Sequence, residues 1–273
     1  MKTGLVSITF RQLEPAEIVN LCIEHNLAAI EWGGDVHVPP GDLKKAKEVR
    51  ALTESAGLKV AAYGSYYFLA GSASRNSHPF EAVLESAVAL GAPLIRVWAG
   101  AKGSDKATEE DWQTAIADSR RIGDLAAKQG LKVAYEYHQG TLTDSTQSAV
   151  RLMKAVNHTA VASFWQPPNG AELQDCCEGL QQVLNLKKLE SVHVFHWWPG
   201  FKDRHPLSTG VERWKKYLRL VHRYEQMTGD KERYVCLEFV KDDKPAHLAD
   251  DAKTLHQVLA EIENEDEVFS EQT

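Results

Sequence analysis

The chain has 273 residues, of which 43% are hydrophobic and 25% charged, and its 31 basic and 38 acidic residues give a formal net charge of −7. This composition is typical of a globular protein and excludes a disordered or fibrous one. No apolar run approaches the roughly 18 residues that a membrane-spanning helix needs. The acidic balance argues against nucleic acid as a partner, because such surfaces usually carry a basic face or stripe.

Residues 1–10 carry a single lysine and only a few apolar side chains, which predicts a first strand and not a signal peptide. We therefore expect a cytoplasmic protein with reduced thiols. Its cysteines match no CxxC metal or redox spacing. They are Cys22, Cys176, Cys177 and Cys236.

Short apolar runs alternate with longer amphipathic stretches along the chain. In chain order, we expect strands at 5–10, 27–32, 58–63, 93–98, 131–137, 159–164, 191–195 and 234–239. Helix start and stop signals lie between these strands. They predict a helix that opens at Glu14-Pro15, helices at 42–56, 78–90 and 108–129, one capped by Asp144, and one at 245–263.

Strands that alternate with helices predict parallel pairing through right-handed crossovers. Eight such units in a chain of this length predict a single α/β domain, a (β/α)8 barrel, over residues 1–263. Residues 264–273 should form an acidic, mobile tail, because 261–273 hold six acidic residues and no basic one. No large apolar stripe marks an interface, although a homo-oligomer is compatible with the sequence.

A doubly wound dinucleotide-binding fold is the main rival architecture. It would place a GxGxxG loop directly after a strand. The first expected strand instead leads into Arg11-Gln12-Leu13-Glu14, and Gly100-Ala101-Lys102-Gly103 has the wrong spacing. We therefore expect no nucleotide cofactor.

Three of the expected strands, the second with Glu31, the fifth and the eighth, end in residues that a purely structural strand does not need. Because side chains alternate along a strand, Glu136 and His138 share the inward face of the fifth strand. By the same alternation, Glu238 points inward at the end of the eighth strand and Phe239 points outward. In a barrel, catalytic residues come from these strand ends.

Buried carboxylates that converge in one barrel mouth repel one another unless they are paired or bind a metal. The seventh expected strand supplies His193, which adds a nitrogen donor to Glu136 and Glu238. This set predicts a site for one divalent cation with oxygen and nitrogen ligands, either Mn²⁺, Mg²⁺ or Zn²⁺.

In these residues and their order, the chain resembles the xylose isomerase-like TIM barrels, a superfamily of sugar and sugar-phosphate isomerases and epimerases. The family pattern has a glutamate ending strand five, Asp-x-x-His/Asn ending strand six, a histidine on strand seven and a glutamate ending strand eight. Glu136, His193 and Glu238 match it. Gln166 stands in place of the family's metal-binding aspartate, and Asn169 matches the substrate-contacting position three residues later.

The resemblance makes Gln166 the fourth metal ligand in this sequence. A glutamine carbonyl can coordinate a hard cation but brings no charge, so we expect weaker metal affinity than in the family. Three interpretations stay open: Gln166 is a ligand, water takes its position, or the protein is a metal-free relative.

The resemblance also implies substrate contacts from the loops at the same end of the barrel. Arg204 is the nearest match to an arginine that contacts substrate in the family's epimerases. The other expected substrate contacts are Glu31, His37, Trp98, Lys102, His138, Asn169 and His196. Glu31 and Arg96 share inward parity, so they could instead pair with each other.

We expect a metal-dependent isomerase or epimerase of carbohydrate metabolism, acting on a small polyhydroxy substrate such as a sugar, sugar phosphate or cyclitol. Glu136 and Glu238 would be acid and base for the proton next to the carbonyl, through an enediolate. Dehydration of a keto-sugar, an inosose or a dehydroshikimate-like acid starts with the same step and is the alternative reaction. A non-catalytic carbohydrate-binding barrel is the non-enzyme alternative, and Gln166 supports it.

The resembled superfamily also contains abasic-site endonucleases with a trinuclear zinc site. That chemistry needs more histidine and aspartate ligands, together with cationic contacts to DNA. Gln166 and the acidic balance argue against it.

Overall fold

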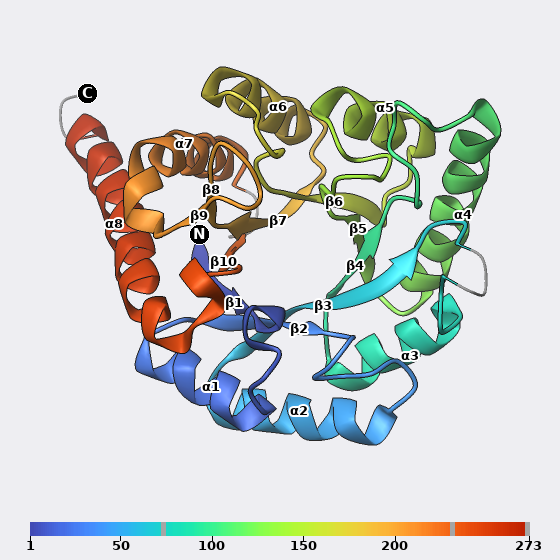
Figure 1. Cartoon of the computed structure of the whole chain (residues 1–273), viewed down its shortest axis with the longest axis horizontal. Coiled ribbons are helices and arrows are strands. Elements are labelled where there is room, and N and C mark those ends of the chain that lie inside the picture. The colour runs from blue at the N-terminus through green and yellow to red at the C-terminus, as the bar shows by residue number, and fades with distance from the viewer. Residues whose placement is uncertain (72–74, 230–232, 271–273) are drawn as a thin grey trace.

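The computed structural model describes residues 1–71, 75–229 and 233–270, with 266–270 described by their backbone alone. Its parallel strands close into a barrel in the order β1-β10-β7-β6-β5-β4-β3-β2. Figure 1 looks into this barrel, with helices α1 to α8 forming the outer ring. The predicted single (β/α)8 architecture is therefore confirmed.

Each barrel strand is followed by a helix that packs on the outside. The barrel strands are β1 (Lys2–Val6), β2 (Ala29–Gly33), β3 (Lys59–Phe68), β4 (Leu94–Trp98), β5 (Lys132–Tyr135), β6 (Val161–Trp165), β7 (Leu189–Val194) and β10 (Tyr234–Leu237). The helices are α1 (Pro15–Glu24), α2 (Leu43–Ser55), α3 (Phe80–Leu90), α4 (Glu109–Lys128), α5 (Thr146–Val156), α6 (Leu173–Asn185), α7 (Val211–Thr228) and α8 (Leu248–Ser270). Among the described residues, none of these helices combines the length and apolarity needed to cross a membrane.

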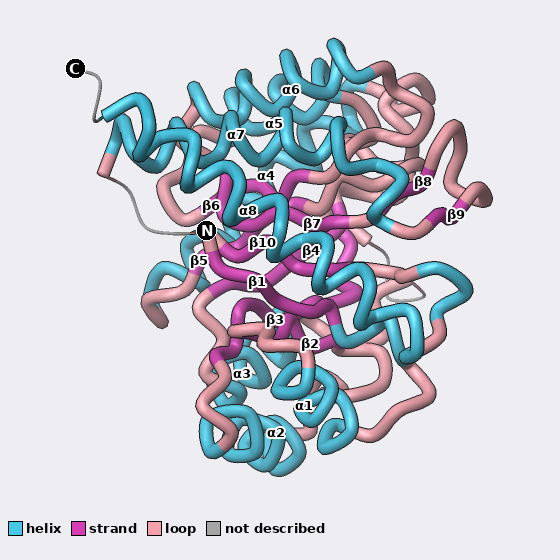
Figure 2. The backbone as a smooth tube through the Cα atoms, turned by 90° about the vertical axis from the view of Figure 1, so that its left-hand side faces the viewer, coloured by secondary structure: helices cyan, strands magenta, loops and turns pink. Residues whose placement is uncertain are grey.

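A short antiparallel hairpin interrupts the connection between β7 and α7. It pairs β8 (His196–Trp197) with β9 (Arg204–His205). Figure 2 shows this hairpin standing out beyond the barrel strands. The sequence pattern did not predict it, because each of its strands has only two residues.

The first strand ends earlier than its sequence predicts. β1 stops at Val6, and Ser7–Phe10 form a buried 3₁₀ turn in place of the expected strand over 5–10. The Oγ of Ser7 accepts a hydrogen bond from the backbone N–H of Gly33 at 2.9 Å and lies 2.9 Å from Nδ1 of His37. These contacts with the β2 loop override the local β propensity, which is a weak preference.

The cap of α5 also differs from the expectation. Ser145, not Asp144, is the N-cap, and its side chain accepts from the backbone N–H of Ser148. One oxygen of Asp144 instead accepts from the backbone N–H of Ser104 at 2.9 Å. Asp144 therefore ties the loop after β5 to the loop after β4.

The acidic C-terminal segment continues the last helix. α8 runs to Ser270, so the expected tail over 264–273 is helical as far as that residue, and 271–273 lie outside the described residues. Nε of Arg219 on α7 donates to Oε2 of Glu265 at 2.8 Å. The mobility of this segment stays a prediction.

The side chains that point into the barrel change from apolar to polar along the barrel axis. A small apolar cluster fills the barrel from four strands: Ala62, Leu94, Ala134, Ala162 and Phe164. Two residues after Leu94, Ala134 and Phe164 come Arg96, Glu136 and Gln166. They keep the same inward parity, and Glu136 and Gln166 directly follow the ends of β5 and β6. The barrel is thus packed with apolar groups at one level and carries its charged groups at the level nearer the strand ends.

One buried carboxyl fixes the start of the segment that follows the hairpin. Oδ1 of Asp251 on α8 accepts from the backbone N–H of Leu207 at 2.8 Å, and Asp251 is 5% exposed. Burial raises the pKa of Asp251 to about 6. Its pKa in the unfolded chain is lower, at about 3.9. Between these two pH values the folded protein binds more protons than the unfolded chain.

We therefore predict that the ionisation of Asp251 lowers the free energy of unfolding as pH rises from about 4 to about 6. Asp251→Asn keeps an oxygen acceptor for Leu207 but cannot ionise. The variant should match the wild type near pH 4 and be more stable at pH 7. Urea unfolding at several pH values measures the difference, and parallel stability profiles for the two proteins would contradict the assignment.

Candidate active site

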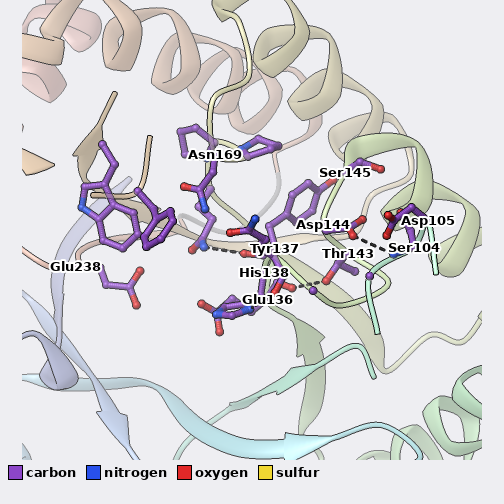
Figure 3. Close-up of a pocket in the computed structure, with 18 of the residues that line it drawn as sticks. Ser104, Asp105, Glu136, Tyr137, His138, Thr143, Asp144, Ser145, Asn169 and Glu238 are labelled. Carbon is purple, nitrogen blue, oxygen red and sulfur yellow. Dashed lines mark hydrogen bonds between the residues drawn. The ribbon is translucent and has the colours of Figure 1, made fainter. Parts of the chain in front are cut away.

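A pocket of about 960 Å³ opens at the end of the barrel where β5, β6 and β10 end. Figure 3 shows Glu238 at one side of this pocket and Ser104 and Asp105 at the other. The loops after β4, β5, β6 and β10 and the β8–β9 hairpin supply its walls. Its lining includes Glu136, His138, Gln166, Asn169, Arg204 and Glu238.

Beside the pocket, three buried charged side chains form one connected group. Nε of Arg96, on β4, donates to Oε1 of Glu31, on β2, at 2.8 Å. Nη1 of Arg96 donates to Oε2 of Glu136, which follows β5. Their exposed fractions are 1% for Arg96, 0% for Glu31 and 4% for Glu136. The pairing of Glu31 with Arg96 that inward parity suggested is confirmed.

The ionised forms of these groups stabilise one another. Burial disfavours the guanidinium charge, but Glu136 and Glu31 outweigh burial and raise the pKa of Arg96. Burial would likewise raise the pKa of Glu31, yet His193 and Arg96 together lower it. Arg96 and Glu31 therefore form a charged pair in the interior of the protein.

His193, on β7, is enclosed between carboxyl and amide groups. Its Nε2 lies 2.9 Å from Oε2 of Glu31, and its Nδ1 lies 2.9 Å from Oε1 of Gln166 and 3.4 Å from Oε2 of Glu238. Burial disfavours the imidazolium, but Glu238 and Glu31 outweigh it and raise the pKa of His193 to about 10. The imidazole thus lies at a point that attracts positive charge.

The same point suits a divalent cation. Glu136, His193 and Glu238 each bring one ligand atom to within 4.8 Å of the others. Arg96 and Nε1 of Trp98 both donate to Oε2 of Glu136, so Oε1 of that carboxylate is left to a cation. Carboxylate and imidazole donors are ligands that Mn²⁺, Mg²⁺ and Zn²⁺ accept. The residues present therefore fit the predicted cation.

Gln166 has a defined orientation beside these donors. Its Nε2 donates to the backbone carbonyl of Tyr137 at 2.7 Å, which directs Oε1 toward Nδ1 of His193. A carboxylate at this position could not donate to that carbonyl. The amide therefore places an oxygen next to the cluster and satisfies the backbone of the β5 loop, but contributes no charge.

His138 stacks on Trp98, with ring centroids 4.5 Å apart and planes 24° apart. Nδ1 of His138 lies 2.8 Å from the backbone carbonyl of Gln139. Because a carbonyl only accepts, Nδ1 carries a proton and Nε2 is the nitrogen left for a ligand. Trp98 itself is outside the pocket lining but links His138 to Glu136.

Arg204 and Asn169 reach the pocket as the sequence predicted. The guanidinium of Arg204 lies over the rings of Trp197 and Phe239, at 4.7 and 4.9 Å from their centroids, and Nη1 donates to Asp243 at 2.6 Å. Phe239 lines the pocket, whereas strand alternation predicted that it would face outward. Its φ of 52° breaks the alternation just beyond β10.

Five expected substrate contacts lie outside the pocket lining: Glu31, His37, Trp98, Lys102 and His196. His37 is buried against Trp32 and bonds to Ser7 and to the backbone carbonyl of Leu13. Lys102 pairs with Asp111 at the start of α4.

His196, on the hairpin, faces Gly210, where a Cβ would come within 2.5 Å of its Nδ1. Glu31 is fully buried and reaches the pocket only through Arg96 and His193. Sequence spacing places each of these residues near a strand end, but the direction of a loop side chain depends on contacts that the spacing does not contain.

Known protein sequences that match this chain belong to the same kind of barrel or are named dehydratases. The sequence model of one protein family, described as "Xylose isomerase-like TIM barrel", matches residues 19–260. The chain is 29% identical over 218 residues to an inosose dehydratase of Geobacillus thermodenitrificans, which covers 71% of this chain and 70% of that protein. It is 25% identical over 220 residues to a 3-dehydroshikimate dehydratase of Bacillus anthracis, which covers 71% and 75%.

Solved structures share the fold. The probable 3-dehydroshikimate (3-DHS) dehydratase AsbF of Bacillus anthracis superposes with a TM-score of 0.74 at 20% identity, over 94% of this chain and 99% of that one. A structure of the IOLI protein with a bound zinc atom superposes with a TM-score of 0.67 at 16% identity, over 96% and 98%.

The buried Arg96 should be essential for stability. Arg96→Met removes the charge that compensates Glu31 and Glu136, and breaking a buried pair in this way costs about 3–5 kcal/mol. The matched control is Arg50→Met on α2, where Arg50 pairs with Glu54 at the exposed surface. That change should stay within about 0.5 kcal/mol. Urea unfolding compares the two, and equal losses in both variants would contradict the role of Arg96.

Proposed function

This chain belongs to the xylose isomerase-like TIM barrel family, and we propose that it is a divalent-metal-dependent dehydratase of a small polyhydroxy ketone. The donors Glu136, His193 and Glu238 carry this proposal, because their ligand atoms lie within 4.8 Å of one another and Glu136 and Glu238 line the pocket. The choice of reaction is supported by two of the curated relatives, which are both named dehydratases. Isomerisation or epimerisation, which the sequence pattern favoured first, begins with the same proton removal.

The cation would be held by Glu136, His193 and Glu238, with the oxygen of Gln166 beside them. A divalent cation there supplies Lewis-acid polarisation of the substrate carbonyl, which acidifies the neighbouring C–H bond. Arg96 and Trp98 both donate to Oε2 of Glu136, so its carboxylate is held in one orientation. Rigid support of this kind is what a metal ligand needs.

The chain's own residues would move the protons. Glu238, 2% exposed at the end of β10, removes the proton next to the carbonyl. The C–H electrons form the C=C bond and the C–O bond at the next carbon breaks. His138 acts in its imidazolium form: it keeps the proton on Nδ1 and gives the one on Nε2 to the departing hydroxyl, which leaves as water. Its stacking on Trp98 holds the ring in place at the wall of the pocket.

The polar lining suits a hydroxylated ring. The amide of Asn169 and the loops around Thr143 and Ser145 offer hydrogen bonds, while Trp197 and Phe239 offer aromatic faces for C–H groups. The relatives' names, inosose dehydratase and 3-dehydroshikimate dehydratase, indicate six-membered rings with a carbonyl. We therefore propose a cyclic keto-polyol or keto-acid as the substrate class.

We predict that the protein loaded with Mn²⁺ eliminates water from an inosose or from 3-dehydroshikimate. Formation of a conjugated enone or aromatic ring is measured by ultraviolet absorbance. Glu238→Gln should reduce kcat by about 10²–10⁴-fold, since it removes a proton-transferring group without changing side-chain shape.

Glu54→Gln, the same substitution at an exposed position of α2, is the matched control and should leave kcat unchanged. Undiminished turnover in Glu238→Gln would falsify the role of this carboxylate. Exchange of substrate hydrogen with deuterated solvent without loss of water would indicate the isomerase or epimerase reaction instead.

We predict that Gln166→Glu raises the affinity for Mn²⁺ by about tenfold or more, because ligand charge tunes metal affinity. The same change loses the hydrogen bond to the carbonyl of Tyr137, so the metal-free variant should melt below the wild type. Isothermal titration with Mn²⁺ and thermal melting in EDTA measure the two effects. Unchanged affinity for Mn²⁺ would show that residue 166 lies outside the ligand shell.

A further inference from the structure

An unbroken series of polar contacts joins the two carboxylates that face the pocket. It runs from Glu238 to Nδ1 of His193, from Nε2 of His193 to Glu31, from Glu31 to Nε of Arg96, and from Nη1 of Arg96 to Glu136. Positive and negative groups alternate along it. Glu31 is the middle member, is 0% exposed and is absent from the pocket lining.

The first contact of Glu31 occupies one nitrogen of His193 and leaves the other to face Gln166 and Glu238. Oε2 of Glu31 lies 2.9 Å from Nε2 of His193, and a carboxylate can only accept a hydrogen bond. Nε2 therefore carries a proton. Nδ1 lies beside the acceptor oxygens of Gln166 and Glu238, so it is the nitrogen that faces the cation position, and it must release its own proton before it can bind a cation there.

The second contact of Glu31 orients the other side of the cluster. Oε1 of Glu31 accepts from Nε of Arg96 at 2.8 Å, which fixes the plane of the guanidinium. The Nη1 of that guanidinium then donates to Oε2 of Glu136. The two oxygens of one carboxylate on β2 thus determine how a residue on β7 and a residue after β5 face the same point.

We propose that Glu31 is a positioning residue for cation binding: it never touches the cation or the substrate, but sets the orientation of His193 directly and of Glu136 through Arg96. This inference rests on the proposed metal-dependent function. Carboxylates that hold a ligating imidazole typically change metal affinity by about 10–100-fold when they are removed.

The backbone around Glu31 is shaped for this arrangement. A Cβ at Gly64 on β3 would lie 2.9 Å from Oε1 of Glu31 and 2.9 Å from Nη2 of Arg96. Both side chains would have to move. Gly64 therefore leaves space for the pair, and a substitution there can displace Glu31 and Arg96 without removing a charge or a hydrogen-bonding group.

The test measures Mn²⁺ affinity by isothermal titration in Glu31→Gln and in the wild type. We expect the dissociation constant to rise about 10–100-fold in Glu31→Gln. The matched control is Glu225→Gln, which also removes a buried carboxylate paired with an arginine, Arg233, but at the opposite end of the barrel. That variant should keep the wild-type affinity for Mn²⁺. The nitrogen coupling of bound Mn²⁺ in pulsed electron paramagnetic resonance should weaken in Glu31→Gln alone.

Gly64→Ala is the second variant, and it tests position without a change of charge. We expect it to weaken Mn²⁺ binding by about tenfold as well, with a wild-type far-ultraviolet circular dichroism spectrum. Wild-type affinity in both Glu31→Gln and Gly64→Ala would overturn the inference and leave the proposed function standing. A wild-type protein that does not bind Mn²⁺ would overturn the metal-dependent function itself, and the inference with it.

Discussion

The arrangement at the mouth of the barrel depends on one buried guanidinium. Arg96 lies between Glu31 and Glu136 and is almost fully excluded from solvent. Removing charges from water costs several kcal/mol for each ion, and the guanidinium offsets part of this cost by pairing with both carboxylates. The pair of Arg96 and Glu31 also requires that the neighbouring residue on β3 has no side chain, and this residue is Gly64. The same few residues therefore both pair the buried charges and fit together in the barrel interior.

The closed barrel is what brings the polar groups together. Glu31, Arg96 and His193 lie on β2, β4 and β7, while Glu136 and Glu238 follow the ends of β5 and β10. No two of these strands except β4 and β5, and β7 and β10, are neighbours in the sheet. Contacts such as Glu31 with His193 therefore cross the interior of the barrel and exist only when it closes. The site and the fold form together.

Much of this could be predicted from the sequence, because barrel strands impose a period of two on their side chains. That period placed Glu136 and Glu238 in the mouth and Glu31 beside Arg96. It failed at Phe239, whose positive φ turns the side chain into the pocket. The period does not apply to His37 and Lys102, which lie in loops and contact Ser7 and Asp111. Loop direction is set by such tertiary contacts, which no short sequence pattern contains.

The amide of Gln166 follows from the charges around it. With a divalent cation bound and His193 neutral, two positive charges would face the carboxylates of Glu136 and Glu238, while Glu31 and Arg96 compensate each other. The buried charges then sum to zero. An aspartate in place of Gln166 would leave one negative charge in excess, and a buried unpaired charge is costly. Gln166 supplies an oxygen beside His193 at no electrostatic cost and satisfies the carbonyl of Tyr137. The departure from the family's aspartate is therefore compatible with a working cation site.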